Sequence, residues 1–179
     1  MYPWGHLAFG YVLYSLSRRL GGRSAPKGGA VIWLVVGTQF PDLVDKPLAW
    51  YAGVLPNGRS LTHSILVACI LLTVAVYLSR RTDQLDGMAF AVGYASHLFG
   101  DALRPLVAGD YERIAFLLWP LVPPLDYSTG GSLGAHLDQL ALDGAPGTEL
   151  AFGALVALLW IRDGAPGLGT LLSVLPSRQ

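Results

Sequence analysis

The sequence predicts an all-α protein, built as an integral membrane helical bundle with about five transmembrane helices and a proline-rich re-entrant or interfacial segment. Hydrophobic residues make up 53% of the 179 residues and charged residues only 13%, which is far from the balance of a soluble domain. The mean hydropathy of +0.47 agrees with this. No internal repeat or long linker divides the chain, so we expect a single domain over residues 1–179.

Five apolar segments are candidate membrane crossings. The clearest is 61–79, nineteen residues without a formal charge, which matches the thickness of a bilayer core. The other four are shorter or interrupted, and they cover residues 7–20, 28–40, 87–103 and 150–161. The second of them is expected to end at Pro41, because proline breaks a helix. Residues 116–125 carry three prolines, which break a helix repeatedly. We therefore expect 116–125 to be re-entrant or interfacial rather than a crossing.

Charged residues between these segments predict the orientation. Basic residues follow the first and third segments, which makes both connections cytoplasmic: Arg18, Arg19, Arg23, Lys27, Arg80 and Arg81. Residues 126–149 contain acidic residues and no lysine or arginine, which suits the outer face. The result is a multi-pass protein of the plasma membrane, in contact with membrane lipids, with its N-terminus outside and its C-terminus inside.

Composition also excludes some classes of function. The formal net charge is zero and no basic stripe is present, so no nucleic-acid partner is expected. Cys69 is the only cysteine and lies in an apolar run, which excludes an internal disulfide.

Two polar residues stand out inside the apolar segment 87–103. His97 and Asp101 are four apart, so they share one helix face with their Cβ atoms about 6 Å apart. Ionisable groups at membrane depth are costly and usually functional. The predicted topology brings four more polar residues to the same outer end of the bundle: His6, Asp42, Asp45 and His63.

This set of imidazoles and carboxylates suits Zn²⁺, with Mn²⁺ or Fe²⁺ as alternatives, and the sequence allows one or two ions. The predicted metal ligands are His6, Asp42, His63, His97 and Asp101. Asp45 would complete the site as a catalytic carboxylate. Its alternatives are an ion pair with Lys46 or a helix cap, and His6 could instead be a polar residue at the interface.

Arg59 precedes His63 by four residues, and its guanidinium suits a phosphate or another oxyanion. A simpler interpretation makes Arg59 an anchor for lipid headgroups. Thr62 is a candidate helix cap, and Thr62 and Ser64 are candidates for holding a metal ligand in position. A serine nucleophile at Ser64 is disfavoured, because Ser64 and His63 are adjacent on a helix and do not face each other.

The order and spacing of these motifs resemble the YdjM-like family of membrane-bound metal-dependent hydrolases, the LexA-binding, inner membrane-associated hydrolase group, and especially its archaeal members. The resemblance covers about the first 125 residues and rests on five motifs: His6-x3-Gly10, Gly37-x3-Pro41-Asp42-x2-Asp45, Arg59-x2-Thr62-His63-Ser64, His97-x3-Asp101 and Trp119-Pro120. It implies an all-helical integral membrane protein with metal-dependent hydrolase activity.

The sequence departs from related patterns at two points. Many members of that family have histidine where Gly58 stands, so one ligand of theirs is missing here. The His-x3-Asp motif is also similar to zinc-dependent phospholipases C and related nucleases. Those enzymes carry a further His-x3-Glu, which this chain lacks, so a trinuclear zinc site is not expected.

The sequence thus predicts a membrane-embedded, metal-dependent hydrolase of a phosphoester, either a small molecule or a lipid, which uses a metal-activated water. The alternative is a non-catalytic membrane protein that binds or transports a divalent metal with the same ligands. A third interpretation is a helical scaffold in which the polar residues only hold the bundle together.

Overall fold

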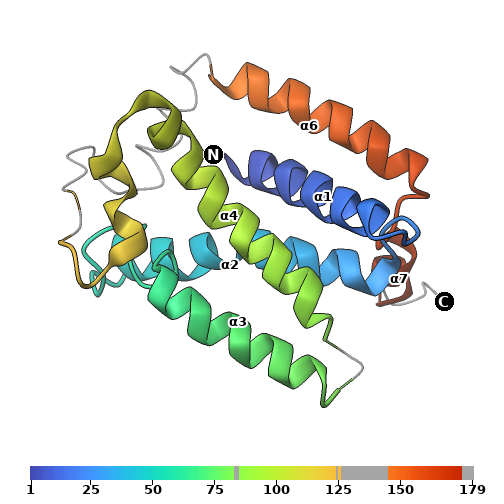
Figure 1. The fold of residues 1–179 in the computed structure, drawn as a ribbon, viewed down its shortest axis with the longest axis horizontal. Coiled ribbons are helices and arrows are strands. Elements are labelled where there is room, and N and C mark those ends of the chain that lie inside the picture. The colour runs from blue at the N-terminus through green and yellow to red at the C-terminus, as the bar shows by residue number, and fades with distance from the viewer. Residues whose placement is uncertain (83–84, 124, 126–144, 175–179) are drawn as a thin grey trace.

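The computed structural model describes residues 1–82, 85–123, 125 and 145–174, and these residues form six α-helices and one 3-10 helix (Figure 1). In chain order the elements are α1 (Pro3–Leu20), α2 (Gly28–Trp50), α3 (Ile65–Ser79), α4 (Gly87–Ala108), η1 (Tyr111–Leu118), α6 (Ala145–Arg162) and α7 (Leu168–Val174). The all-helical class predicted from the sequence is confirmed.

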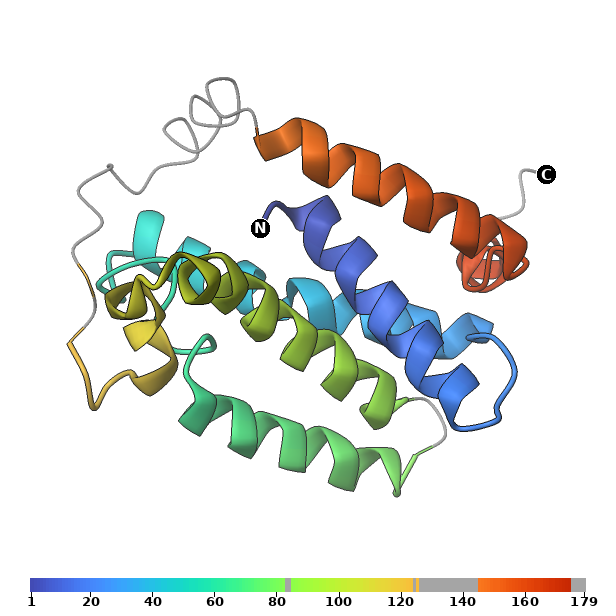
Figure 2. The same ribbon diagram turned by 45° about the horizontal axis from the view of Figure 1, so that its top comes forward.

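Helix α4 is the centre of the bundle, since it packs against α1, α2, α3 and η1. Figures 1 and 2 show α3 on one side of α4 and α1 on the other, with α6 covering α1. Helices α2 and α4 run in the same direction, because a Cβ atom on Gly37 would meet Phe90 and Tyr94, while His97, further along α4, lies beside Asp42, further along α2. Helices α1 and α3 run against them. The start of α1, the end of α2, the start of α3 and the end of α4 therefore meet at one end of the bundle.

Two glycines allow α2 and α4 to touch along their backbones. A Cβ atom on Gly37 would lie 2.3 Å from the carbonyl oxygen of Phe90, and one on Gly93 would lie 2.3 Å from that of Leu34. Any larger side chain at either position would collide with backbone rather than with a movable side chain. The close approach buries Leu34 and Tyr94 almost completely on either side of the crossing.

The expected end of the second helix at Pro41 is wrong, because α2 continues through Pro41 and Pro47 to Trp50. Proline removes one hydrogen bond from a helix and usually kinks or breaks it. Here the segment before α3 holds the chain beyond the proline: the Thr62 hydroxyl oxygen lies 3.0 Å from the Pro41 carbonyl oxygen, and Asp45 accepts hydrogen bonds from the same segment. These tertiary contacts outweigh the local preference.

Helix α3 is shorter than the nineteen residues expected from apolarity. The Ser64 hydroxyl accepts a hydrogen bond from the Leu66 amide, which caps the helix and starts it at Ile65. The cap is therefore Ser64 and not Thr62.

Within the described residues, no helix combines the length and the apolarity that crossing a bilayer requires. The five crossings stay a prediction.

The C-terminal part adds two helices to the bundle. The proline-rich segment 116–125 begins in η1 and continues into a turn after the cis bond between Trp119 and Pro120. Most of the expected outer connection, 126–149, lies outside the described residues. Helix α6 is fixed to α1 at its far end, where Asp163 accepts a hydrogen bond from the Tyr11 hydroxyl (2.8 Å) and pairs with Arg19.

Candidate metal centre

The polar residues predicted to converge lie together at the end of the bundle where four elements meet. His6 comes from the start of α1, Asp42 from α2, His63 from the residue before the α3 cap, and His97 with Asp101 from α4. The three histidine side chains are at most 1% exposed. Buried imidazoles and carboxylates require partners, because an unsatisfied polar group in the interior is strongly destabilising.

Hydrogen bonds at Nδ1 determine which nitrogen of His63 and His97 carries the proton. His97 Nδ1 lies 2.7 Å from the main-chain carbonyl oxygen of Thr38, which can only accept, so this nitrogen carries hydrogen. His63 Nδ1 lies 2.9 Å from the Asp45 carboxylate, and the same argument applies. In a neutral imidazole the other nitrogen, Nε2, then has an unshared electron pair.

These two electron pairs point at each other. The Nε2 atoms of His63 and His97 are 3.1 Å apart. Asp42 Oδ1 lies 3.5 Å from the first and 3.8 Å from the second, and Asp101 Oδ2 lies 3.7 Å and 3.9 Å from them. Ligands in a tetrahedral zinc site stand about 3.3 Å from one another, given metal–ligand bonds of about 2.0 Å. His63, His97 and Asp101 therefore offer three ligand atoms within 4.8 Å of one another, spaced slightly wider than in a zinc tetrahedron, and His6, Asp42 and His97 form a second such group.

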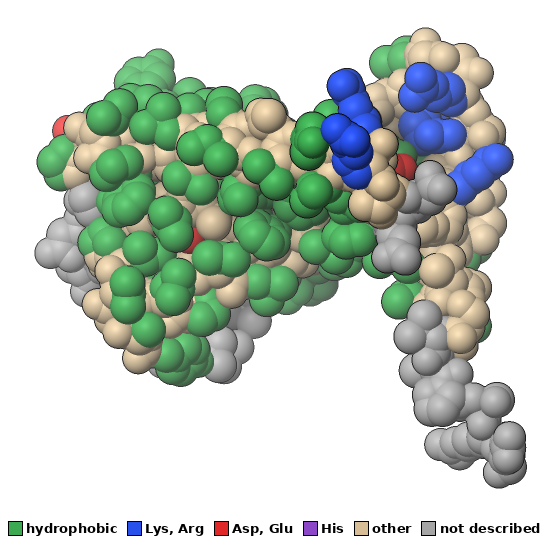
Figure 3. All heavy atoms as spheres, turned by 90° about the horizontal axis from the view of Figure 1, so that it is seen from below, with side chains coloured by type: hydrophobic (Ala, Val, Ile, Leu, Met, Phe, Trp, Pro, Cys, Tyr) green, Lys and Arg blue, Asp and Glu red, His purple; other side chains and the backbone are tan. Residues whose placement is uncertain are grey.

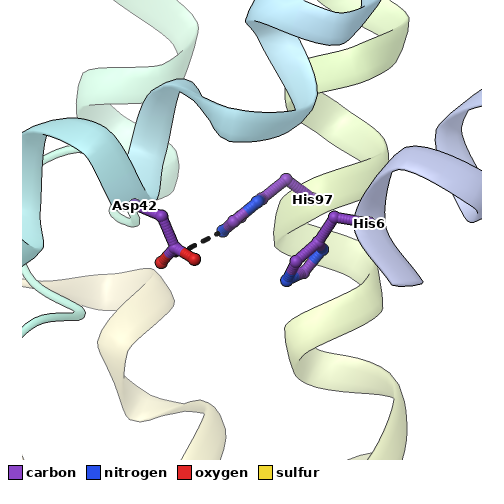
Figure 4. A group of neighbouring side chains, drawn as sticks. All are labelled: His6, Asp42 and His97. Carbon is purple, nitrogen blue, oxygen red and sulfur yellow. Dashed lines mark ion pairs between the residues drawn. The ribbon is translucent and has the colours of Figure 1, made fainter. Parts of the chain in front are cut away.

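His6 extends this cluster on its other side. Its ring stacks on that of His97, with centroids 3.8 Å apart, and its Nε2 lies 3.3 Å from Asp101 Oδ1. Neither ring nitrogen of His6 makes a hydrogen bond within the described part of the chain, although both are buried. Figure 4 shows His6, Asp42 and His97 directed toward one another from α1, α2 and α4. A buried imidazole without a hydrogen bond, beside two carboxylates, fits a ligand for a second metal position.

The outward oxygen of Asp42 is held by a cation. Lys46, one helical turn further along α2, donates to Asp42 Oδ2 at 2.6 Å, which leaves Oδ1 facing the histidines. Burial raises the pKa of Asp42, but its contact with His63 and the charge of Lys46 outweigh it and hold the pKa well below its ordinary value. Asp42 is thus an ionised ligand group with one oxygen directed inward.

Asp101 is arranged in a similar way. The Arg59 Nε lies 2.8 Å from Asp101 Oδ2, and the main-chain nitrogen of Met1 lies 2.9 Å from Oδ1. The Arg59 side chain is one-third exposed, so it marks the edge where the buried cluster meets the surface. Its guanidinium also lies over the ring of Phe116, 5.9 Å from the centroid.

Asp45 has no oxygen left for a metal. Its carboxylate accepts hydrogen bonds from the amides of Ser60 and Thr62, from the Thr62 hydroxyl and from His63 Nδ1, all between 2.7 and 3.2 Å. Burial raises the pKa of Asp45, and these hydrogen bonds, led by that from His63, lower it below its ordinary value. The geometry favours a positioning role for Asp45 over the catalytic role expected from the sequence, and neither Lys46 nor a helix N-terminus is its partner.

Thr62 supports the loop that carries a candidate metal ligand, whereas Ser64 does not contact a ligand. Thr62 connects Asp45 to Pro41 through its hydroxyl, and its carbonyl accepts a hydrogen bond from Tyr94, so it helps fix the loop that carries His63. Ser64 caps α3 and donates to the carbonyl of Trp119, so it bonds to the segment after η1 rather than to a ligand.

Two groups that shape the site were not expected from the sequence. The partnership of Asp42 with Lys46 could have been found, because the two residues are four apart on a helix. The Thr38 carbonyl carries no sequence signal, since every residue has one and only the crossing of α2 and α4 brings it to His97.

Comparison with known proteins adds one finding. The family model described as YdjM inner membrane protein matches residues 1–162, which includes every residue of the cluster. No curated protein and no solved structure matched this chain significantly.

Proposed function

Because the chain belongs to the YdjM family of inner membrane proteins, we propose that it is a membrane-embedded, metal-dependent hydrolase of a phosphoester. The substrate is a small molecule or a lipid, and the site lies near the outer face of a multi-pass bundle. Zn²⁺ is the preferred ion, with Mn²⁺ or Fe²⁺ as alternatives, and the cluster offers room for one or two.

One observation carries this proposal: the facing Nε2 atoms of His63 and His97, 3.1 Å apart and bordered by two carboxylates. Two neutral imidazoles in this arrangement repel each other, since both present electron pairs. A divalent cation would remove this repulsion, and His63 and His97 would hold it. Both rings are also held from behind at Nδ1, by Asp45 and by the Thr38 carbonyl, which is the usual way that proteins orient histidine ligands of a metal.

The residues divide into three tasks. His63, His97, Asp42 and Asp101 hold the metal, and His6 supplies a further nitrogen on the side of Asp101. When bound, the metal supplies an activated water near neutral pH and positive charge for the phosphoryl oxygens. Arg59 stands at the exposed edge, where its guanidinium can meet a phosphate that enters the cluster.

The second candidate function is non-catalytic binding or transport of a divalent metal. It is favoured by the observation that Lys46 and Arg59 already contact the two metal-facing aspartates, Asp42 and Asp101. In that interpretation both cations only balance the buried negative charge.

Metal analysis of the detergent-purified protein tests both candidates. We expect bound zinc in the wild type and its loss in His97→Ala and in Asp101→Ala, together with loss of bis-(p-nitrophenyl) phosphate hydrolysis. Asp110 is an exposed carboxylate that follows α4 at the same end of the bundle, so Asp110→Asn serves as the matched control. This variant should keep both its zinc and its hydrolysis of the phosphoester. Full metal content in the His97 and Asp101 variants would refute the site.

Arg59→Lys separates the hydrolase from the metal carrier. Lysine keeps a positive charge near Asp101 but loses the guanidinium fork. A hydrolase should retain its metal and lose turnover, whereas a carrier should be unaffected in both metal content and transport. A zinc-loaded wild type that hydrolyses no phosphoester would favour the carrier.

A further inference from the structure

Most basic side chains gather at the end of the bundle opposite the candidate metal centre. We call this the basic end; it comprises Arg18, Arg19, Arg23, Lys27, Arg80, Arg81 and Arg162. Figure 3 shows lysine and arginine concentrated toward one end of the face, while hydrophobic side chains cover most of the rest. The metal centre is far from it, because Gly29 and Asp42 are thirteen residues apart on α2, or about 20 Å.

The fold brings these residues together from separate elements. The end of α1 and the start of α2 carry four of them, the end of α3 carries Arg80 and Arg81, and the end of α6 carries Arg162. Asp163, next to Arg162, pairs with Arg19 of α1, which fixes the end of α6 to this group. A cavity of about 400 Å³ joins the start of α2 to the turn between α3 and α4, with Gly29, Trp33, Ser79 and Thr82 in its wall.

Of these seven cations only Arg19 pairs with a carboxylate among the described residues; the other six do not, namely Arg18, Arg23, Lys27, Arg80, Arg81 and Arg162. At the opposite end Lys46, Arg59 and Arg113 each pair with an aspartate, and Arg104 is the exception among the described residues. The basic end therefore has positive charge that the described chain does not neutralise, and its residues are exposed.

An apolar surface leads from the basic end along the bundle. On α3 the large side chains point outward, with Ile70 65% and Tyr77 55% exposed, and Arg81 folds back over the ring of Tyr77. On α6, Leu155, Leu158 and Ile161 are exposed in the same way, and Ile161 adjoins Arg162. Exposed apolar faces that finish in unneutralised cations fit one chemistry, namely acyl chains that end in anionic headgroups.

We propose that the basic end binds the headgroups of anionic phospholipids, whose acyl chains lie along α3 and α6. Electrostatic attraction selects these lipids over zwitterionic ones, and each basic residue near such a surface strengthens binding about fivefold. The headgroups lie on the exposed cations and not in the cavity beside Trp33, because the lining of that cavity includes the carboxylate of Asp86 and no basic residue. The proposal does not depend on the catalytic assignment, because no residue of the metal centre takes part.

Quenching of tryptophan fluorescence by brominated lipids tests the proposal. Full-length protein in a neutral detergent is titrated with brominated phosphatidylglycerol and, separately, with brominated phosphatidylcholine. We expect half-maximal quenching of the wild type by brominated phosphatidylglycerol at a mole fraction at least tenfold lower than by brominated phosphatidylcholine. The combined variant R23Q/K27Q/R80Q/R162Q should lose this preference, and so should the wild type at high salt.

Two controls make the result decisive. The variant R104Q/R113Q removes exposed arginines from the other end and should keep the tenfold preference. Inorganic phosphate at matched ionic strength should not compete with the lipid, and competition would show that the end binds a free anion instead. Equal quenching by the two lipids in the wild type, or an unchanged preference in a combined variant that melts like the wild type, would overturn the proposal.

Discussion

Asp45 offers the sharpest test of how the site is held together. Its carboxylate is fully buried and accepts hydrogen bonds at both oxygens, two at Oδ1 and the others at Oδ2. In Asp45→Asn one oxygen becomes an NH₂ group, so in either orientation of the amide at least one main-chain N–H of residues 60–62 faces another donor. A hydrogen bond to a charged group contributes about 1.5–3 kcal/mol, so the variant should lose about 1.5–3 kcal/mol of unfolding free energy.

For a chain of this length, about 1.5–3 kcal/mol corresponds to a fall in Tm of about 3–12 °C. Thermal unfolding followed by tryptophan fluorescence measures it. His63 also loses the carboxylate that fixes its ring, so zinc affinity should fall about 10–100-fold. Asp110→Asn, which removes an exposed partner of Arg113, should change stability by less than about 0.5 kcal/mol. If Asp45→Asn melts within 2 °C of the wild type and binds zinc equally well, the positioning role of Asp45 is wrong.

Three further predictions follow from contacts described above. Gly37→Ala should destabilise the protein by about 1–3 kcal/mol in thermal or denaturant unfolding, because the added methyl meets the backbone of α4, whereas Gly29→Ala, where a Cβ has nothing within 4 Å, should be nearly neutral. Lys46→Met should lower the Tm of the metal-free protein more than that of the zinc-loaded protein, since the ion replaces the lost charge beside Asp42; equal losses in both forms would contradict this. Removing metal with a chelator should lower the Tm of the wild type but not that of His97→Ala, because zinc at about 100 times its Kd adds about 2.7 kcal/mol of stability.

Spacing and charge predicted much of the architecture. Apolar runs located the helices, and alternation of basic and acidic connections indicated that His6, Asp42, His63 and the His97–Asp101 pair belong to one end of the bundle. The structure brings those residues within ion-pair distance. Local rules were sufficient because the direction of each helix decides which half of it lies at a given end of the bundle, and charge patterning indicated those directions.

The details that failed depend on contacts between distant segments. Pro41 predicted a helix end, but Thr62, twenty-one residues later, holds the chain beyond it. Residues 51–64 show no hydrophobic periodicity from which their structure could be predicted. Nothing in the sequence therefore indicated that their amides donate hydrogen bonds to both carboxylate oxygens of Asp45. The Thr38 carbonyl behind His97 likewise exists only once α2 and α4 have crossed.

The crossing of α2 and α4 at Gly37 and Gly93 also has a consequence for the metal centre. Gly93 lies one turn before His97, and Gly37 lies five residues before Asp42, so the two helices are locked against sliding directly below the ligands. A slip of α4 by one residue would move His97 by about 1.5 Å along the axis and turn it by about 100°. His97 and Asp101 would then both move away from His6, Asp42 and His63. The backbone contact thus sets the register of the whole cluster, and the site is either assembled completely or not at all.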